Sequence, residues 1–588
     1  MRFLSSIGAF FRRLGQPFYA KLFLIALLLP NFILILSPYL TMTGALVGLL
    51  LPASVYLLLI ALVRKPGRVV LWGIPLLLLN AFQLVLLTIF DGSMIAVDMI
   101  LNLFTSNSDE AGELLSGILL PILGVLTIYT IVVILAIRSV HLLSCLGITY
   151  RRRAIVLSGA MFATGIGLAI YTGSKVPGYK IRNEVYPLGV FYNMYVAGLK
   201  LREVAHYEET SAGFNYEAKA RHTEAEHEIY VFVLGETSRA YSWSLYGYPR
   251  DTNPRLKARR AELAVFRDVI TQSNTTYKSV PILLSPADAA HANQLPRVRG
   301  IMEAFRDAGF YTLYISNQPE NRSFVDFFAL QANEHHRIKE ELHRGIPLLD
   351  RKPIYDMDML PYLDRALSLG HRRLFVVLHT YGAHYSYKDR YPLEARHFED
   401  DRAERASIRE RARLINGYDN AIRQTDALLD SIMLRLERLP KASSALFYIS
   451  DHGEDIYDDY RERILHSSPS LSYYQLHVPA LFWASPRYRE LYPQALEVAR
   501  SNEDKPLSSN VTFHTLLDMA GISTPYFVDS LSVLRTNLCV GSRVYLNDRY
   551  ECVPLEELGL TREDELMWQK MGLAPYLTQK NEDNERKH

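Results

Sequence analysis

Long apolar stretches dominate the first third of the chain, whereas shorter apolar runs alternate with polar segments through the rest. Five of the long stretches are almost free of charge, and each is close to the roughly 20 residues that a helix needs to span a membrane. They are Leu22–Ser37, Gly44–Val63, Val69–Phe90, Gly117–Ile137 and Ala154–Tyr171. The pattern therefore predicts a membrane domain of five transmembrane helices over residues 1–173. The four stretches that follow the first favour an uncleaved anchor over a signal peptide.

Positive charges in the short loops predict how this domain is oriented. They lie before the first stretch, between the second and third, and between the fourth and fifth, at Arg2, Arg12, Arg13, Arg64, Lys65, Arg68, Arg138, Arg151, Arg152 and Arg153. Such ends face the cytoplasm. The loop over residues 91–116 holds five acidic residues and neither lysine nor arginine, as expected of an external loop. We therefore expect a cytoplasmic amino terminus and, after an odd number of spans, an external carboxyl-terminal domain.

Short apolar runs after the membrane region alternate with amphipathic segments. We expect strands at Ile229–Leu234, Tyr311–Ser316, Leu374–His379, Ala445–Ser450 and Ala480–Trp483, with helices such as Arg297–Ala308 and Arg413–Leu436 between them. This rhythm predicts an α/β domain with a largely parallel central sheet over residues 217–579. Residues 174–216 mix aromatic and charged side chains, which fits either an amphipathic segment on the membrane surface or a plain linker helix. The charged tail, residues 580–588, is expected to be disordered.

Composition narrows the classes of partner and leaves one question about the thiols open. The chain has 64 basic and 62 acidic residues, so no overall charge attracts nucleic acid. Of its three cysteines, Cys145 falls in a predicted cytoplasmic loop, where thiols stay reduced. Cys539 and Cys552 fall in the external domain. The sequence allows a disulfide or two free thiols there, because it does not give their geometry.

Metal-ligand side chains follow three of the expected strands. Glu236 follows the first, Asp451 and His452 follow another, and a third runs into His379 and then His384. In a parallel sheet, ligands gather at the carboxyl ends of the strands. A lone acidic residue there more often caps a helix, and a lone histidine more often has an ordinary role in the core or on the surface. Three strand ends with the same chemistry instead favour a catalytic zinc site built from nitrogen and oxygen donors.

A hydroxyl-rich segment before Ser279-Val280-Pro281 supplies candidate nucleophiles. Ser273, Thr275 and Thr276 all lie in it, and their spacing does not choose among them. A hydroxyl is a poor nucleophile at neutral pH, and coordination to zinc would activate it. The alternative is an ordinary polar turn.

Taken together, these motifs resemble those of the phosphoethanolamine transferases of the alkaline-phosphatase superfamily, which act on lipid A and on core lipopolysaccharide. The matching segments are Gly235-Glu236-Thr237-Ser238-Arg239, residues 245–254, Tyr418-Asp419-Asn420 with Thr425-Asp426, and Ser450-Asp451-His452-Gly453-Glu454 followed by His466. The resemblance implies an enzyme of the bacterial inner membrane with a periplasmic catalytic domain. It would move phosphoethanolamine from phosphatidylethanolamine to a lipopolysaccharide or another envelope glycan and release diacylglycerol.

The resemblance also implies roles for particular residues. The zinc ligands would be Glu236, Thr276, Asp451 and His452, with Thr276 as the nucleophile. One zinc ion would be tightly bound. Whether a second zinc ion binds during turnover is left open. His384 and His466 match histidines that hold phosphate or a second metal, and His379 matches a motif position that is not a ligand. Asn102, Ser106 and Glu110 match a polar triplet that binds the lipid substrate.

Departures from the family pattern concern the acceptor. Gln272 and Ile282 stand where lipid A enzymes have paired cysteines. Pro319 and Arg322 fall near the serine and lysine of their substrate pocket, although Arg322 could still contact a phosphate as the lysine does. The sequence Ser316-Asn317-Gln318 is more like the core-lipopolysaccharide or glucan-modifying branch.

Three other functions remain to be weighed against this one. A phosphoglycerol transferase of the same superfamily would share the spans and the threonine nucleophile, and the donor headgroup would distinguish it. A non-catalytic metal-binding membrane sensor would retain ligands without needing the hydroxyl. A sulfatase is disfavoured, because no Cys-x-Pro-x-Arg or Ser-x-Pro-x-Arg segment lies near the nucleophile region.

Overall fold

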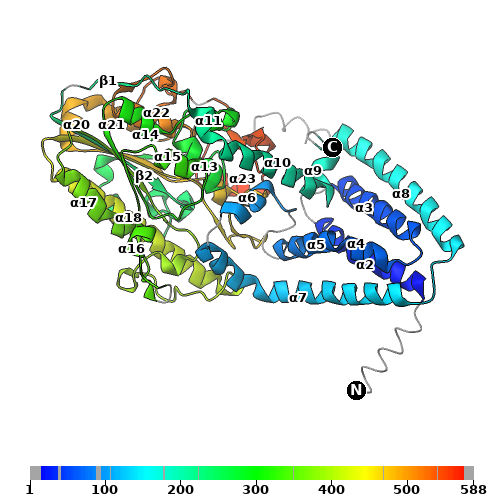
Figure 1. Ribbon diagram of the computed structural model, residues 1–588. Coiled ribbons are helices and arrows are strands. Elements are labelled where there is room, and N and C mark those ends of the chain that lie inside the picture. The colour runs from blue at the N-terminus through cyan, green and yellow to red at the C-terminus, as the bar shows by residue number, and fades with distance from the viewer. Residues whose placement is uncertain are drawn as a thin grey trace. The chain divides into compact units, whose positions relative to one another are not determined.

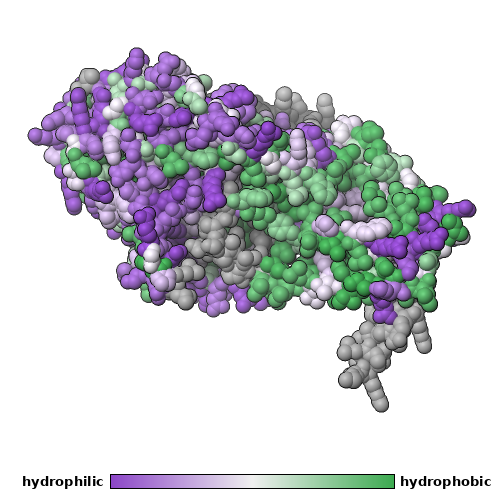
Figure 2. Space-filling model, in the orientation of Figure 1, coloured by the Kyte–Doolittle hydropathy of each residue, from purple (hydrophilic) through white to green (hydrophobic). Residues whose placement is uncertain are grey.

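The computed structural model describes residues 15–36, 41–87, 94–105, 108–176, 179–222, 224–347, 350–467, 469–539 and 541–574, with side chains left out between residues 105 and 118. The chain divides into two compact units, which are described in turn. The first covers Met1–Ile100 and Leu114–Gly198, and the second covers Leu101–Glu113 and Leu199–His588. Figure 2 shows apolar residues gathered over the helices of the first unit and hydrophilic ones over the second.

Apolar helices build the first unit (Figure 1). Within the described residues, four are long and apolar enough to cross a membrane: α2 (Gln16–Leu34), α3 (Met42–Leu62), the Leu119–His141 part of α7 (Ser108–His141) and α8 (Ile148–Lys175). Large apolar side chains on α7 and α8 are exposed, including Leu120 and Val156 at 79% and 73%. An exposed apolar surface of this kind is suited to lipid rather than water.

The third expected span is interrupted. Residues predicted to form one helix form two, α4 (Gly67–Trp72) and α5 (Ile74–Leu86), with Gly73 between them. Pro75 lies in the first turn of α5, where its missing N–H costs no helical hydrogen bond. Five expected spans therefore correspond to four long helices and a shorter, broken one.

The segment between the last long helix and the sheet is largely helical. It contains α9 (Ile181–Glu184), α10 (Leu188–Ala205) and α11 (Tyr207–Ser211). Tyr186, at 1% exposure, donates a hydrogen bond of 2.7 Å to Asn80 Oδ1, and its carbonyl oxygen accepts one of 2.9 Å from Asn31 Nδ2. The start of this segment is therefore part of the first unit's packing.

A seven-stranded sheet organises the second unit, in the order β3-β11-β8-β2-β7-β5-β6. Its strands are β2 (His227–Gly235), β3 (Leu263–Phe266), β5 (Tyr311–Ser316), β6 (Glu334–Arg337), β7 (Arg373–His379), β8 (Ala442–Ser450) and β11 (Ala480–Ala484). Neighbouring strands from β8 to β6 are parallel, whereas β11 runs antiparallel to both β8 and β3. The expected strands and the largely parallel sheet are confirmed, and β3 and β6 are additions that the sequence pattern did not reveal.

Both faces of this sheet are covered. Ile229, Val231 and Val233 of β2 belong to one core with side chains of α17 (Leu360–Ser368) and α18 (Arg411–Glu437). Tyr230 points to the other face, where its ring centroid lies 5.8 Å from that of Phe310 and 6.3 Å from that of Tyr488. Burial on both faces explains why these strands are nearly continuous apolar runs.

The register of the central strands places their carboxyl ends side by side. Gly235 of β2 pairs with Ser450 of β8, and Leu234 of β2 pairs with His379 of β7. The residues that follow these three strands therefore meet at one edge of the sheet.

Candidate active site

The ends of two neighbouring strands bring two carboxylate side chains and one imidazole together. Glu236 follows β2, while Asp451 and His452 follow β8, and the backbone N–H of Asp451 bonds to the carbonyl of Gly235 at 3.0 Å. A ligand atom from each of the three side chains lies within 4.8 Å of the others. All three side chains are 1% exposed or less. The cluster expected from the sequence is therefore formed, and it is buried.

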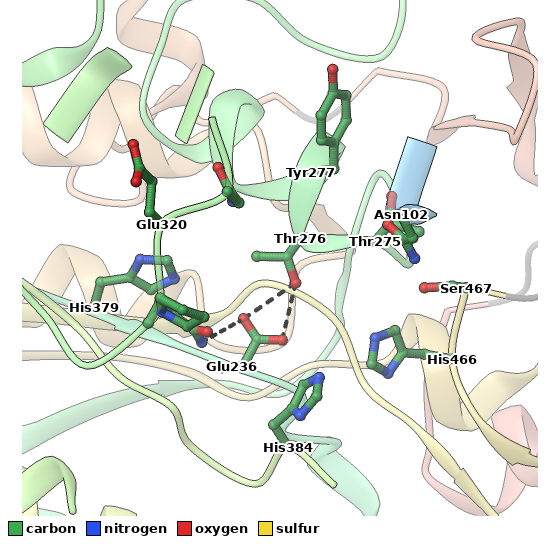
Figure 3. A pocket seen from close by; sticks show the side chains of 13 residues that line it. Asn102, Glu236, Thr275, Thr276, Tyr277, Glu320, His379, His384, His466 and Ser467 are labelled. Carbon is green, nitrogen blue, oxygen red and sulfur yellow. Dashed lines mark hydrogen bonds between the residues drawn. The ribbon is translucent and has the colours of Figure 1, made fainter. Parts of the chain in front are cut away.

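Thr276 places its hydroxyl against this cluster (Figure 3). It is the first residue of α13 (Thr276–Leu283). Its Oγ1 lies 3.0 and 3.3 Å from the two carboxylate oxygens of Glu236, and 3.3 Å from His452 Nε2. The other two hydroxyls that the sequence left open, Ser273 Oγ and Thr275 Oγ1, lie 3.5 Å from each other.

Hydrogen bonds orient Asp451 and His452. Asp451 Oδ1 accepts from the backbone N–H groups of Thr237 and His452 at 3.2 and 2.7 Å, and Oδ2 accepts from Ser279 Oγ at 3.1 Å. His452 Nδ1 lies 3.1 Å from the carbonyl of Gly453, which only accepts, so this nitrogen carries the proton. Burial lowers the pKa of His452 to about 4. The ring is therefore neutral, with its Nε2 lone pair directed at the cluster.

This donor set fits a divalent metal ion. Burial raises the pKa of Asp451 above its usual range, because a buried carboxylate is poorly solvated. A cation held between Asp451 and Glu236 would compensate their charges. One imidazole nitrogen with carboxylate and hydroxyl oxygens is a set that zinc accepts. The metal would be held by Glu236, Asp451, His452 and Thr276.

Two further histidines lie beside this cluster. His384 comes from the loop after β7, and His466 follows the short strand β10 (Ile464–Leu465). The ring centroid of His466 is 4.1 Å from that of His452 and 5.7 Å from that of His384. His466 Nδ1 lies 3.0 Å from Glu454 Oε2, and burial lowers the pKa of the His466 ring to about 4.

Glu236 and Thr276 line a pocket that is continuous with solvent. Its lining is mostly polar: Asn102, Glu236, Thr275, Thr276, Tyr277, Gln318, Pro319, Glu320, Asn321, His379, His384, His466 and Ser467. Figure 3 shows Thr276 near its middle, with His384 and His466 on one side. The structure therefore brings Thr276, Glu236 and the two histidines expected to bind phosphate, His384 and His466, to one cavity.

The expected lipid-binding residues are placed unequally. Asn102, on α6 (Val97–Thr105), belongs to the second unit and lines the pocket. Ser106 and the side chain of Glu110 lie outside the described residues. Arg322 is exposed and is not among the residues that line the pocket.

Sequence reasoning missed Gln318 as a partner of the metal cluster. Gln318 Nε2 donates to Glu236 Oε2 at 3.2 Å and to the carbonyl of Thr380 at 2.8 Å. It thus fixes a carboxylate oxygen of the cluster to the loop after β7. In the sequence, Gln318 stood out only as part of Ser316-Asn317-Gln318, a pattern that indicated which branch of the family the chain resembles and not a contact with the metal ligands.

Asp356 was missed altogether, and it holds the loop that carries His384. Its Oδ1 accepts from the backbone N–H of Tyr381 at 2.7 Å and from Asn317 Nδ2 at 2.8 Å. Its Oδ2 accepts from the backbone N–H of Gly382 at 2.9 Å. Asp356 begins a short 3₁₀ helix far along the chain from the site motifs, so no local pattern pointed to it.

His379 and the external cysteines complete the predicted residues. His379 is 1% exposed, its Nδ1 lies 3.1 Å from Tyr314 Oη, and burial lowers the pKa of the His379 ring to about 3. It lines the pocket without joining the cluster. Cys539 and Cys552 are both exposed and free in the structure.

The chain matches a protein-family model and several characterised relatives. The model described as Sulfatase matches residues 228–522, which is half of the 588-residue chain. Phosphoethanolamine transferase EptA of Escherichia coli K12 is 28% identical over 316 residues, 52% of this chain and 55% of that protein. The chain thus spans about half the length of the curated relatives it matches.

Solved structures show the same fold. The integral membrane protein EptA of Neisseria meningitidis, a lipooligosaccharide phosphoethanolamine transferase, has a TM-score of 0.69 and 22% identity, and covers 88% of this chain and 98% of its own. The carboxyl-terminal periplasmic domain of Escherichia coli EptC, solved in complex with zinc, has a TM-score of 0.52 and 23% identity, and covers 58% and 96%. The expected combination of apolar membrane helices and an α/β domain with a largely parallel central sheet is confirmed. The chain therefore belongs to the protein family whose model is described as Sulfatase, and the relatives named above are phosphoethanolamine transferases.

Proposed function

We propose that this protein transfers phosphoethanolamine from phosphatidylethanolamine to a lipopolysaccharide or another cell-envelope glycan and releases diacylglycerol. The observation that carries the proposal is the position of Thr276 Oγ1, 3.0 Å from Glu236 Oε1 and 3.3 Å from His452 Nε2. A hydroxyl held among metal-ligand side chains is equipped to be a nucleophile. The names of the relatives support the phosphoethanolamine group.

In the first step, the Thr276 hydroxyl attacks the phosphorus of the donor lipid. A bond forms between phosphorus and Oγ1, and the bond from phosphorus to the diacylglycerol oxygen breaks. The net proton transfer runs from the threonine hydroxyl to that leaving oxygen. His384 and His466 line the same pocket, where they can bond the phosphate oxygens or relay the proton.

In the second step, a hydroxyl or phosphate oxygen of the acceptor attacks the phosphothreonine. A bond forms between phosphorus and the acceptor oxygen, the bond from phosphorus to Oγ1 breaks, and Oγ1 takes up the proton that the acceptor or the solvent releases, which restores the Thr276 hydroxyl. Zinc, when bound by Glu236, Asp451, His452 and Thr276, would lower the pKa of the hydroxyl and offset negative charge on phosphate. Zinc is proposed because the donor set suits it and because the related EptC domain was solved with it.

The proposed location is the bacterial inner membrane, with the amino terminus in the cytoplasm and the catalytic domain in the periplasm. The apolar helices and the positive charges in the predicted cytoplasmic loops support this orientation. An anchored domain would keep the site near its lipid donor, which raises the donor's effective concentration. Asn102 is proposed to contact that lipid, with Ser106, Glu110 and Arg322 as the other candidates.

The experiment is a donor assay on the purified full-length protein. Fluorescent phosphatidylethanolamine in detergent with zinc should yield diacylglycerol from the wild type and not from Thr276→Ala. Ser273→Ala and Thr275→Ala are matched controls, because each removes one neighbouring hydroxyl. Equal release from the wild type and Thr276→Ala would contradict the nucleophile, and release from phosphatidylglycerol alone would indicate a phosphoglycerol transferase instead.

A further inference from the structure

The pocket around Thr276 contains an acidic side chain that the mechanism above does not use. Among the described residues that line it, two are acidic, Glu236 and Glu320. Glu236 already contacts Thr276 at 3.0 Å and lies 3.5 Å from His452. Glu320 is therefore the lining carboxylate that is left to bind a ligand.

Glu320, Thr276 and the two histidines line the same pocket. Figure 3 shows Glu320 and His384 on opposite sides of Thr276. A phosphoryl group on Thr276 would have the histidines on one side and Glu320 on the other. In phosphoethanolamine, a two-carbon linker joins the phosphate to an ammonium, so a donor with its phosphate at Thr276 would have its ammonium in the same pocket. The ammonium then needs an anionic or oxygen partner.

Glu320 can turn toward a ligand without leaving a charge unpaired. Its carboxylate lies 3.8 Å from Arg337 Nη1, and its side chain is 46% exposed, which makes this ion pair weak. Arg337 also lies 3.2 Å from Asp326 Oδ1 and 3.9 Å from Glu340 Oε2. Those two carboxylates remain beside Arg337 when Glu320 moves.

We infer that Glu320 binds the ammonium of the donor headgroup and makes the pocket selective for a cationic headgroup over a neutral one. The inference rests on the proposed function, since it names the part of the donor that Glu320 recognises. It gives Glu320 a role in choosing between an ethanolamine and a glycerol headgroup, because glycerol offers no charge to the carboxylate. Loss of one partly exposed charged contact should change the rate ratio for the two kinds of headgroup by about tenfold.

The test compares two lipids that differ only at the end of the headgroup. Phosphatidylpropanol has a methyl group where phosphatidylethanolamine has the ammonium, so it keeps the size and removes the charge. Diacylglycerol release from both lipids is measured with the full-length wild type and with Glu320→Gln. We expect the wild type to prefer phosphatidylethanolamine. In Glu320→Gln, the ratio of the rate with phosphatidylethanolamine to the rate with phosphatidylpropanol should fall about tenfold, because the rate with phosphatidylethanolamine falls and the other does not.

Glu340→Gln is the matched control. Glu340 pairs with the same Arg337 atom at 3.9 Å and is 49% exposed, but it is not among the residues that line the pocket. It should keep the wild-type preference. An unchanged preference in Glu320→Gln, or an equal fall for both lipids, would overturn the inference and leave the proposed function standing. No release from either lipid by the wild type would contradict the proposed function and the inference with it.

Discussion

Gly382 lies so close to Glu236 that a Cβ atom on the glycine would overlap the carbonyl oxygen of Glu236. The backbone N–H of the next residue, Ala383, bonds to that same oxygen at 3.1 Å. Gly382 also has φ +53°, a conformation that L side chains rarely adopt. The loop that carries His384 is therefore packed directly against the backbone of a metal-ligand residue.

Gly382→Ala should disrupt the site. The new methyl group must displace either the loop or Glu236, so we expect an activity loss of at least about tenfold and a stability loss of about 1–3 kcal/mol. Gly370→Ala is the control, because Gly370 has φ +67° and no atom within 4 Å of its added Cβ. It should lose stability alone. Thermal unfolding and diacylglycerol release measure the two effects, and equal activity losses in both variants would argue against the close contact.

Asp356→Asn should slow the reaction without removing the metal. An amide in place of the carboxylate turns one acceptor into a donor, and that donor faces a backbone N–H of Tyr381 or Gly382. Loss of such a charged hydrogen bond costs about 1.5–3 kcal/mol, which corresponds to roughly tenfold or more in rate if the loop shifts. Bound zinc, measured by atomic absorption, should stay at the wild-type level.

The control for this variant lies two residues away. Asp358 Oδ2 accepts from the backbone N–H of Tyr355 at 2.8 Å and caps the same short helix. Asp358→Asn should therefore reduce stability and keep the rate. If it slowed the reaction as much as Asp356→Asn does, the hydrogen bonds from Asp356 to the loop would not be the cause.

Removal of the metal should abolish activity reversibly. We expect a chelator to strip the protein of zinc and of diacylglycerol release, and added zinc to restore both. Asp451→Asn should lose most of its bound metal, because it replaces a proposed ligand. Asp268→Asn tests whether the loss of any buried carboxylate lowers the metal content equally, since Asp268 is 3% exposed and pairs with Arg543 at 2.6 Å. Full metal content in Asp451→Asn would contradict the ligand assignment.

The two external cysteines should react as thiols in the native protein. Both are free and exposed in the structure. In a Cys145→Ser background, a thiol reagent should therefore modify two cysteines without denaturant, and dithiothreitol should leave the activity unchanged. Modification of neither cysteine until a reductant is added would show instead that Cys539 and Cys552 form a disulfide.

The strands and the metal cluster could be predicted because their signals are local. Each strand is a short apolar run, and Glu236, Asp451 and His452 directly follow two of them. Parallel pairing then brings those strand ends together, so chain position alone located most of the site. The choice of Thr276 among three hydroxyls needed the family resemblance, because spacing does not show which side chain turns inward.

Other features depend on contacts between distant segments. Asp356 binds backbone N–H groups 25 and 26 residues further along the chain, and no sequence pattern marks such a partner. The antiparallel direction of β11 is likewise set by its pairing with β8 and β3. The break at Gly73 was overlooked because the apolar run continues across it, although Gly73 and Pro75 are residues that commonly mark the end and the start of a helix.

The most direct test of the account is the mass of the peptide that contains Thr276 after the first step of the reaction, in which the donor lipid reacts without an acceptor. Purified protein is incubated with phosphatidylethanolamine in the absence of acceptor, quenched in acid and digested, and the peptide that contains residue 276 is analysed by tandem mass spectrometry. We predict a mass increase of one phosphoethanolamine group on Thr276, absent from Thr276→Ala and lost when acceptor is added. Phosphoethanolamine on Ser273 or Thr275 would contradict the account, and so would diacylglycerol release with no modified peptide.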